Sequence, residues 1–179
     1  MTAWPDPDPR YWRPLVWGSL AAGVALLAVF VVQGRALGVI VAAAALVASV
    51  TGLRVLRLPR PVLAALPPAA VLNAASIGWD WYTAWDPFDL WAHFLNPVFL
   101  VVPSMVWLHR ADIIPERPGS PLALGAAVVY GLVIAVAWEV IETFFWAYPL
   151  SDTASDVGLG VLGALAGGWL AGRILEPGR

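Results

Sequence analysis

The sequence predicts an all-α integral membrane protein, a polytopic bundle of six transmembrane helices. The chain of 179 residues is 60% hydrophobic and 12% charged, whereas soluble domains are about 45–50% apolar and about 25% charged. Six apolar segments also follow one another, and each reaches the roughly 17–25 residues that a helix needs to cross a bilayer. These segments are 15–33, 36–53, 62–80, 88–108, 121–146 and 154–175.

The third segment departs most from the pattern of a regular transmembrane helix. Pro67 and Pro68 interrupt it, and we expect a kink there because proline removes a backbone donor and clashes with the preceding turn. Five spans with this segment re-entrant are the alternative topology. In either case we expect an extended cytoplasmic tail at 1–14, a single bundle at 15–175 and a short C-terminal tail at 176–179.

The arginines predict the orientation of the bundle. With six alternating spans, only Arg35 falls on the side opposite to the two termini. Positive charge collects on the cytoplasmic side of membrane proteins, so both termini are predicted to be cytoplasmic. The arginines on that side are Arg10, Arg13, Arg54, Arg57, Arg60, Arg110, Arg117, Arg173 and Arg179.

The acidic residues have the opposite distribution. Many of them lie at or near the predicted outer ends of spans, which would attract cations. These are Asp80, Asp86, Asp89, Glu139, Glu142, Asp152 and Asp156. The net charge of −2 gives no indication of nucleic-acid binding. The absence of cysteine and lysine excludes thiol catalysis, thiolate metal sites and Schiff-base chemistry at lysine.

Three of the predicted spans each carry a pair of ionisable groups at a similar depth. Residues three or four apart share a face of a helix, so each pair points in one direction. The pairs are Asp89 with His93, Glu139 with Glu142, and Asp152 with Asp156. We therefore predict one outward-facing cluster at headgroup depth, with Asn73, Asp80 and Asp86 from the preceding stretch as supporting residues.

Each of these groups also has a simpler interpretation. Asp152 could cap the N-terminus of the last helix, and Asp156 could complement its dipole. Asp89 could be an acid at a wet interface, and His93 a neutral histidine bonded to a carbonyl group. Glu139 is hardest to explain in this way, because a charge at the membrane centre costs about 2.5–3.5 kcal/mol and requires a partner, a proton or a water-filled cavity.

The stretches "DLWAHF" (89–94), "AVAWEVIETFF" (135–145) and "SDTASDVGLGVLGAL" (151–165) resemble the YjdF-like family of uncharacterised bacterial inner-membrane proteins, and more distantly the VanZ-like proteins. The resemblance covers about 86–170. It implies a multi-pass protein of the bacterial inner membrane, and it adds Trp138 and Thr153 to the shared site. The sequence departs from the family pattern after His93, where it carries Asn96 and Pro97.

Three functions follow from such a cluster. Carboxylates with one histidine suit a divalent ion such as Mg²⁺, Mn²⁺ or Zn²⁺. A metal-dependent hydrolase or transferase could then act on a membrane lipid or lipid-linked substrate, with Glu139, Glu142, His93 and Asp89 as candidate catalytic residues and Asp156 as a further ligand. The alternatives are a cation- or proton-coupled transporter or binding protein, and a non-catalytic envelope accessory protein.

The last apolar segment is rich in glycine. Gly163 and Gly167, and likewise Gly168 and Gly172, are four residues apart, a spacing that lets helices approach closely in lipid. Tight packing inside the bundle is the interpretation we favour. The other is a homodimer formed through this helix.

Overall fold

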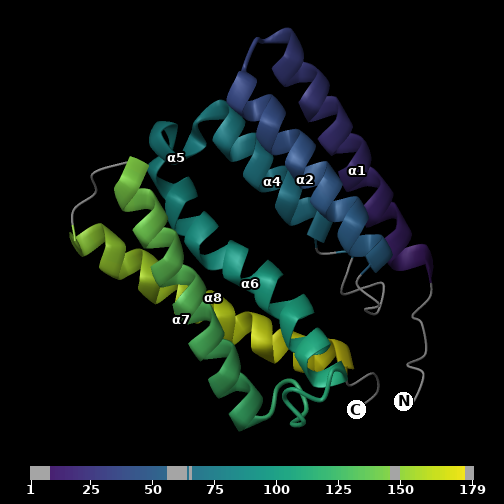
Figure 1. Ribbon diagram of the computed structural model, residues 1–179, viewed down its shortest axis with the longest axis vertical. Helices are drawn as coiled ribbons and strands as arrows, with labels where there is room; N and C mark the ends of the chain where they lie inside the picture. Colours follow the sequence, from purple (N-terminus) through teal and green to yellow (C-terminus); the bar gives the residue numbers. More distant parts are fainter. Residues whose placement is uncertain (1–8, 56–63, 65, 146–149, 176–179) are drawn as a thin grey trace. The chain divides into compact units, whose positions relative to one another are not determined.

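The computed structural model describes residues 9–55, 64, 66–145 and 150–175, and within these ranges the chain forms helices joined by turns (Figure 1). This confirms the predicted all-α class. Two compact units are present: unit 1 is Met1–Asp86 and unit 2 is Pro87–Arg179. The single bundle expected over 15–175 stays a prediction.

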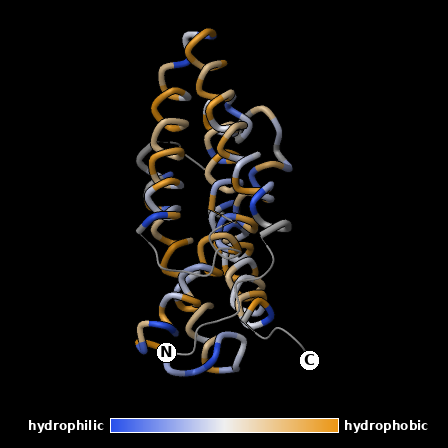
Figure 2. Tube along the Cα trace, turned by 90° about the vertical axis from the view of Figure 1, so that its right-hand side faces the viewer, coloured by the Kyte–Doolittle hydropathy of each residue, from blue (hydrophilic) through white to orange (hydrophobic). Residues whose placement is uncertain are grey.

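Within the described ranges, five helices are long and apolar enough to cross a membrane. Figure 2 shows hydrophobic stretches along the helical parts of the chain. The chain is therefore a multi-pass membrane protein by the length and composition of its helices. The five are α1 (Pro9–Val32), α2 (Ala36–Val55), α6 (Asp86–Arg110), α7 (Pro121–Phe145) and α8 (Leu150–Leu175).

The start of the first helix differs from the prediction. α1 begins at Pro9 and contains Pro14, so the expectation of an extended tail as far as residue 14 is wrong. Proline at the first helical position costs little, because its missing N–H would have no partner there and its φ is already helical. The rest of the predicted N-terminal tail (1–8) and the predicted C-terminal tail (176–179) lie outside the described residues.

The third apolar segment forms a shorter helix than expected. α4 runs from Leu66 to Trp79, about 21 Å at 1.5 Å per residue, and the one-turn helix α5 (Trp81–Ala84) follows it. Pro67 and Pro68 fall in the first turn of α4. The predicted kink is wrong, because the first turn of a helix tolerates prolines that its interior would not.

The C-terminal end of α4 lies against the turn between α1 and α2. Arg35 in that turn donates a hydrogen bond of 2.7 Å to the carbonyl oxygen of Gly78. The fully buried Phe30 sits beside Gly78, and its ring meets that of Trp79 edge to face at 5.3 Å. Trp79 also donates to Gln33 over 3.2 Å. These contacts place the end of α4 at the same end of unit 1 as the α1–α2 turn.

In unit 2, α7 and α8 pack antiparallel through small residues. A Cβ added to Gly160 of α8 would lie 2.8 Å from the Cβ of Ala135, and one added to Gly168 would lie 2.8 Å from that of Ala127. Gly131 of α7 meets Ala164 of α8 in the same way. Small side chains at this spacing allow close contact between membrane helices without a hydrophobic driving force.

Helix α6 runs parallel to α8 and touches its backbone. Gly163 faces the carbonyl oxygen of Phe94, and a Cβ added to Gly167 would lie 3.0 Å from the carbonyl oxygen of Val98. The four glycines predicted to pack, Gly163, Gly167, Gly168 and Gly172, therefore do so inside unit 2, as the favoured interpretation predicted. A homodimer through this helix stays a prediction.

Candidate metal centre

The first two turns of α6 present a carboxylate and an imidazole on one face. Asp89 and His93 are one turn apart, and His93 Nε2 lies 3.4 Å from Asp89 Oδ1. The Asp89 side chain is 25% exposed and that of His93 is 6% exposed. Pro97, one turn after His93, has no N–H for the His93 carbonyl group, so the regular ladder of α6 is interrupted just below the imidazole.

The C-terminal half of α7 contributes a buried glutamate to the other side of the imidazole. Glu139 Oε1 lies 3.8 Å from His93 Nδ1, and the side chain is 9% exposed. Glu139 follows Ala135 by one turn, and Ala135 is the residue that packs on Gly160. The contact between α7 and α8 therefore turns Glu139 toward α6 and α8.

The most deeply buried member of the cluster comes from α8. Asp156 is 2% exposed, and its Oδ2 lies 3.9 Å from His93 Nε2. Asp156 precedes Gly160 by one turn, and a Cβ on Gly160 would lie 3.9 Å from the carbonyl oxygen of His93. The close approach of α8 to both neighbouring helices thus points Asp156 at the imidazole.

The imidazole of His93 is the centre of the cluster. Its Nε2 faces Asp89 and Asp156, while its Nδ1 faces Glu139. The ring nitrogens therefore approach carboxylates, contrary to the interpretation of His93 as a histidine bonded to a carbonyl group. Two sets of donor atoms lie within 4.8 Å of one another: Asp89, His93 and Asp156 form one, and His93, Glu139 and Glu142 form the other.

Three polar atoms of this cluster are buried without a hydrogen-bond partner in the described part of the chain. They are His93 Nε2, Glu139 Oε1 and Asp156 Oδ1. The 3.4 Å approach of Asp89 to Nε2 does not have hydrogen-bond geometry. Buried polar atoms are nearly always paired, and leaving one unpaired costs about 1–3 kcal/mol, or more for a charged group. Two of these atoms, His93 Nε2 and Asp156 Oδ1, belong to the side of the ring that faces Asp89, and they indicate a ligand there.

The donor set suits a divalent cation. Tetrahedral ligands about 2.0–2.1 Å from Zn²⁺ lie roughly 3.3 Å from one another, and the separations of 3.4 Å and 3.9 Å around Nε2 are slightly wider. One imidazole nitrogen with several carboxylate oxygens fits Zn²⁺ or Mn²⁺, and additional water ligands would suit Mg²⁺. The part-exposed Asp89 marks the side from which water or a substrate would enter.

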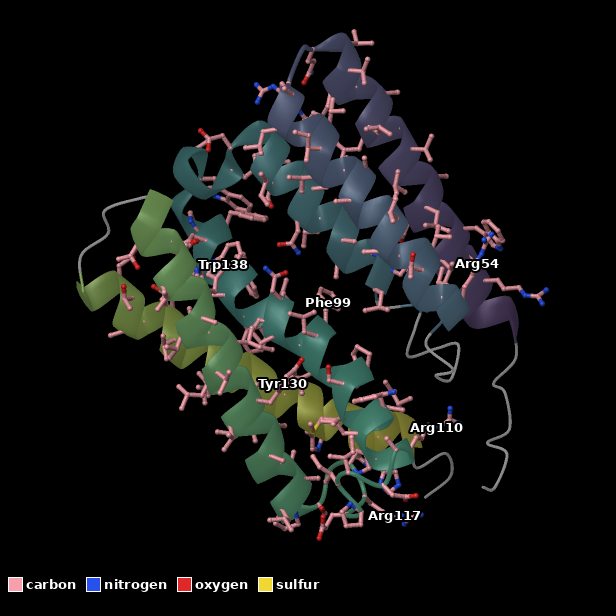
Figure 3. The ribbon with its side chains drawn as sticks, in the orientation of Figure 1. Arg54, Phe99, Arg110, Arg117, Tyr130 and Trp138 are labelled. Carbon is pink, nitrogen blue, oxygen red and sulfur yellow. The ribbon has the colours of Figure 1, made fainter. Side chains whose placement is uncertain are left out.

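Glu142 and Trp138 complete the α7 side of the cluster. Glu142 is 7% exposed, and Trp138 lies one turn earlier on the same helix. Trp138 is labelled in Figure 3 on the C-terminal half of α7. The supporting role that the resemblance implied for Trp138 stays a prediction.

Asp152 and Thr153 lie in the first turns of α8, and the participation of Thr153 in the site stays a prediction. α8 begins at Leu150, so Asp152 is in its first turn and complements the helix dipole. The N-cap interpretation of Asp152 is therefore wrong. Both side chains are half-buried, and among the described residues the carboxylates within 4 Å of a His93 ring nitrogen are Asp89, Glu139 and Asp156, without Asp152.

The predicted supporting residues Asn73, Asp80 and Asp86 all belong to unit 1. Asn73 donates to the carbonyl oxygen of Ala69 on its own helix over 2.9 Å. Asp80 is exposed, with a left-handed backbone (φ 59°) between α4 and α5. Their participation in the site stays a prediction.

Sequence reasoning predicted the packing of Gly163 but missed the part that Gly160 plays in this site. Gly160 and Gly163 bring α8 against α6 and α7 at the level of the cluster. The available signal was the position of Gly160, four residues after Asp156 and so on the same face of the helix.

Comparison with family models, with curated proteins and with solved structures found no match to this chain.

Proposed function

We propose that the cluster around His93 binds a divalent metal ion and that the protein is a metal-dependent membrane hydrolase or transferase. Its substrate class is a lipid or a lipid-linked molecule presented at headgroup depth. Membership of the YjdF-like family, and a location in the bacterial inner membrane, belong to this proposal and rest on the three resembling stretches.

One observation carries the proposal. His93 Nε2, Glu139 Oε1 and Asp156 Oδ1 come from three helices, are buried, and have no hydrogen-bond partner in the described ranges. A cation held by His93 Nε2 and Asp156 would neutralise that carboxylate and supply the interactions that these two residues lack. A structural cluster that only ties helices together would pair its own atoms, because unpaired polar atoms oppose packing.

The arrangement supports distinct roles for the residues. We assign Asp89, His93 and Asp156 to the metal, since their donor atoms form one of the two close sets. Glu139 Oε1 faces Nδ1 at 3.8 Å, which is too long for a hydrogen bond in this structure. With the ion bound it would accept the Nδ1–H and fix the tautomer that leaves Nε2 free to bind the ion, as carboxylates do behind metal-binding histidines. Glu142, buried beside it, is the candidate general base. The bound ion would supply Lewis acidity or an activated water.

Six spans with cytoplasmic termini form the topology that we propose. The contact of Arg35 with Gly78 supports it, because α4 ends where α1 ends and α2 begins. Since α2 runs away from that end, the chain must return before α4 finishes. That return fits a third crossing better than a segment that re-enters and leaves on the same side.

Elemental analysis of the detergent-purified protein tests metal binding. After equilibration with Mg²⁺, Mn²⁺ and Zn²⁺, we expect about one ion per chain for the wild type and loss of that ion in Asp156→Asn. Glu139→Ala should weaken binding by about 10–100-fold, the range measured for residues behind the ligands. Asp112→Asn is the matched control, because Asp112 is an exposed aspartate in the connection after α6.

A substrate screen tests the reaction. Lipid phosphates and lipid-linked sugars are offered in mixed micelles, and metal-dependent release of phosphate or headgroup should depend on Asp156. Absence of bound metal in every buffer, together with proton-linked flux in liposomes that depends on Glu139, would overturn the enzyme assignment in favour of transport.

A further inference from the structure

A cavity lies at the end of unit 2 that is opposite to the cluster around His93. Its volume is about 310 Å³, and it is lined by the connection between α6 and α7 and by the last turns of α8. Arg117, Ser120, Trp169 and Arg173 contribute its polar and aromatic side chains. Arg173 follows Asp156 on α8 by about 25 Å at 1.5 Å per residue, close to the thickness of the hydrocarbon core of a bilayer. Figure 3 shows Arg117 at the end of unit 2 away from Trp138.

The connection is held against α8 by two glycines. Gly119 has a φ of +88°, and a Cβ on it would lie 3.0 Å from the Cα of Gly172; a Cβ on Gly172 would lie 2.6 Å from the carbonyl oxygen of Pro118. This backbone contact fixes Arg117 and Ser120 beside Arg173. The cavity is therefore built by packing and does not depend on the long side chains alone.

The chemistry of the cavity suits a phosphate group. In the described ranges neither Arg117 nor Arg173 forms an ion pair with a carboxylate. Arg173 lies over the ring of Trp169, 5.2 Å from its centroid. Ser120 Oγ accepts from the N–H of Ala123 at 3.3 Å, so its own O–H can donate. α7 starts at Pro121 without an acid in its first turn, and its positive dipole end adds to the attraction.

An exposed apolar stripe leads along α8 to this cavity. Leu162, Leu165 and Trp169 are 55%, 41% and 53% exposed, and with Arg173 they follow one another at spacings of three, four and four residues. Such spacings keep them on one helix face. An acyl chain could lie along the leucines while its headgroup reaches the arginines, which matches basic pockets that bind anionic lipids between membrane helices.

We propose that Arg117, Ser120 and Arg173 bind the phosphate of an anionic phospholipid, with Trp169 at the headgroup boundary. This lipid site is distinct from the cluster around His93. It lies at the membrane face that the arginine distribution assigns to the cytoplasm.

Native mass spectrometry of the full chain, released from nanodiscs, tests the proposal. We expect wild-type protein to retain phosphatidylglycerol in preference to phosphatidylcholine. The Arg117→Gln/Arg173→Gln variant should lose about tenfold or more of that preference. Arg54→Gln is the matched control, because Arg54 is an exposed arginine in the last turn of α2 in unit 1.

Two further arms complete the experiment. Arg173→Lys keeps the charge and should lose less of the preference than Arg173→Gln, which separates lipid binding from a folding defect. Equal phosphatidylglycerol retention by the wild type and the double variant would overturn the site. Displacement of the lipid by millimolar inorganic phosphate, with no effect of acyl chains, would overturn the assignment to a lipid.

Discussion

Nε2 of His93 on α6 lies 3.9 Å from Oδ2 of Asp156 on α8, in the most deeply buried part of the cluster. Neither Nε2 nor the other oxygen of that carboxylate has a hydrogen-bond partner among the described residues. Without a ligand this arrangement is costly, because a buried charge without compensation destabilises the folded state. His93 and Asp156 should therefore lower the stability of the metal-free protein and raise the stability of the metal-bound protein.

Replacement of the Asp156 carboxylate tests whether its effect on stability changes sign when metal is bound. In chelator, Asp156→Asn should raise the Tm by about 2–4 °C, which corresponds to about 1 kcal/mol for a chain of this size. With metal at about 100 times its Kd, the wild type should gain about 2.7 kcal/mol and the variant almost nothing. Thermal unfolding in detergent, followed by circular dichroism, measures both. A variant that is less stable in chelator and still responds to metal would contradict our account of the site.

Replacement of the imidazole should remove the metal site altogether. Both donor sets include His93, so His93→Gln should abolish stoichiometric metal whichever set binds the ion. His109→Gln is the matched control: His109 is near the other end of α6, with Nδ1 3.3 Å from the carbonyl oxygen of Ile114. Metal content after dialysis is the measurement. Equal loss in both variants would point to a general effect of removing histidine.

Addition of a single methyl group should separate α6 from α8. Gly163→Ala places a Cβ against the carbonyl oxygen of Phe94, and overpacking of this kind costs about 1–3 kcal/mol. Gly158→Ala has open space around its Cβ and should be neutral or stabilising by about 0.5–1 kcal/mol. Unfolding of both variants in a denaturing detergent gives the comparison. Equal stability would show that the two helices can move apart at no cost.

Loss of the guanidinium at the α1–α2 turn should loosen the end of α4. Arg35 donates to the carbonyl oxygen of Gly78 near the C-terminus of that helix, where positive charge is favourable. We expect Arg35→Gln to destabilise the protein by about 1–2 kcal/mol, and to increase hydrogen exchange in the last turn of α4. Arg54→Gln, at the exposed end of α2, should have little effect. No change in exchange near Trp79 would argue against the contact.

The membrane helices and the core of the site could be predicted from the sequence because both depend on simple regularities. Long apolar runs predicted the bounds of α2, α6 and α7 to within a few residues. Spacings of three and four residues placed Asp89 with His93, and Glu139 with Glu142, on shared faces. Burial cost then identified Glu139 as a residue in need of a partner.

The remaining features depend on contacts between segments, which spacing does not reveal. From the sequence alone, Pro67 and Pro68 predict a kink. The prediction fails because α4 starts at Leu66, which puts both prolines in its first turn. Asp152 looks like a cap until α8 is seen to begin at Leu150. The cavity at Arg117 and Arg173 depends on the packing of Gly119 on Gly172, a contact between residues far apart in the sequence.

The contact of Gly160 with Ala135 has a consequence for insertions and deletions in this chain. One residue added to α8 between Asp156 and Gly160 would rotate the aspartate by about 100° around the helix axis, away from the imidazole. A residue added between Arg110 and Arg117 would change neither helix. Insertions and deletions should therefore be tolerated in that connection. They should not be tolerated between Asp156 and Gly160, because the number of residues there determines whether the aspartate points at the imidazole.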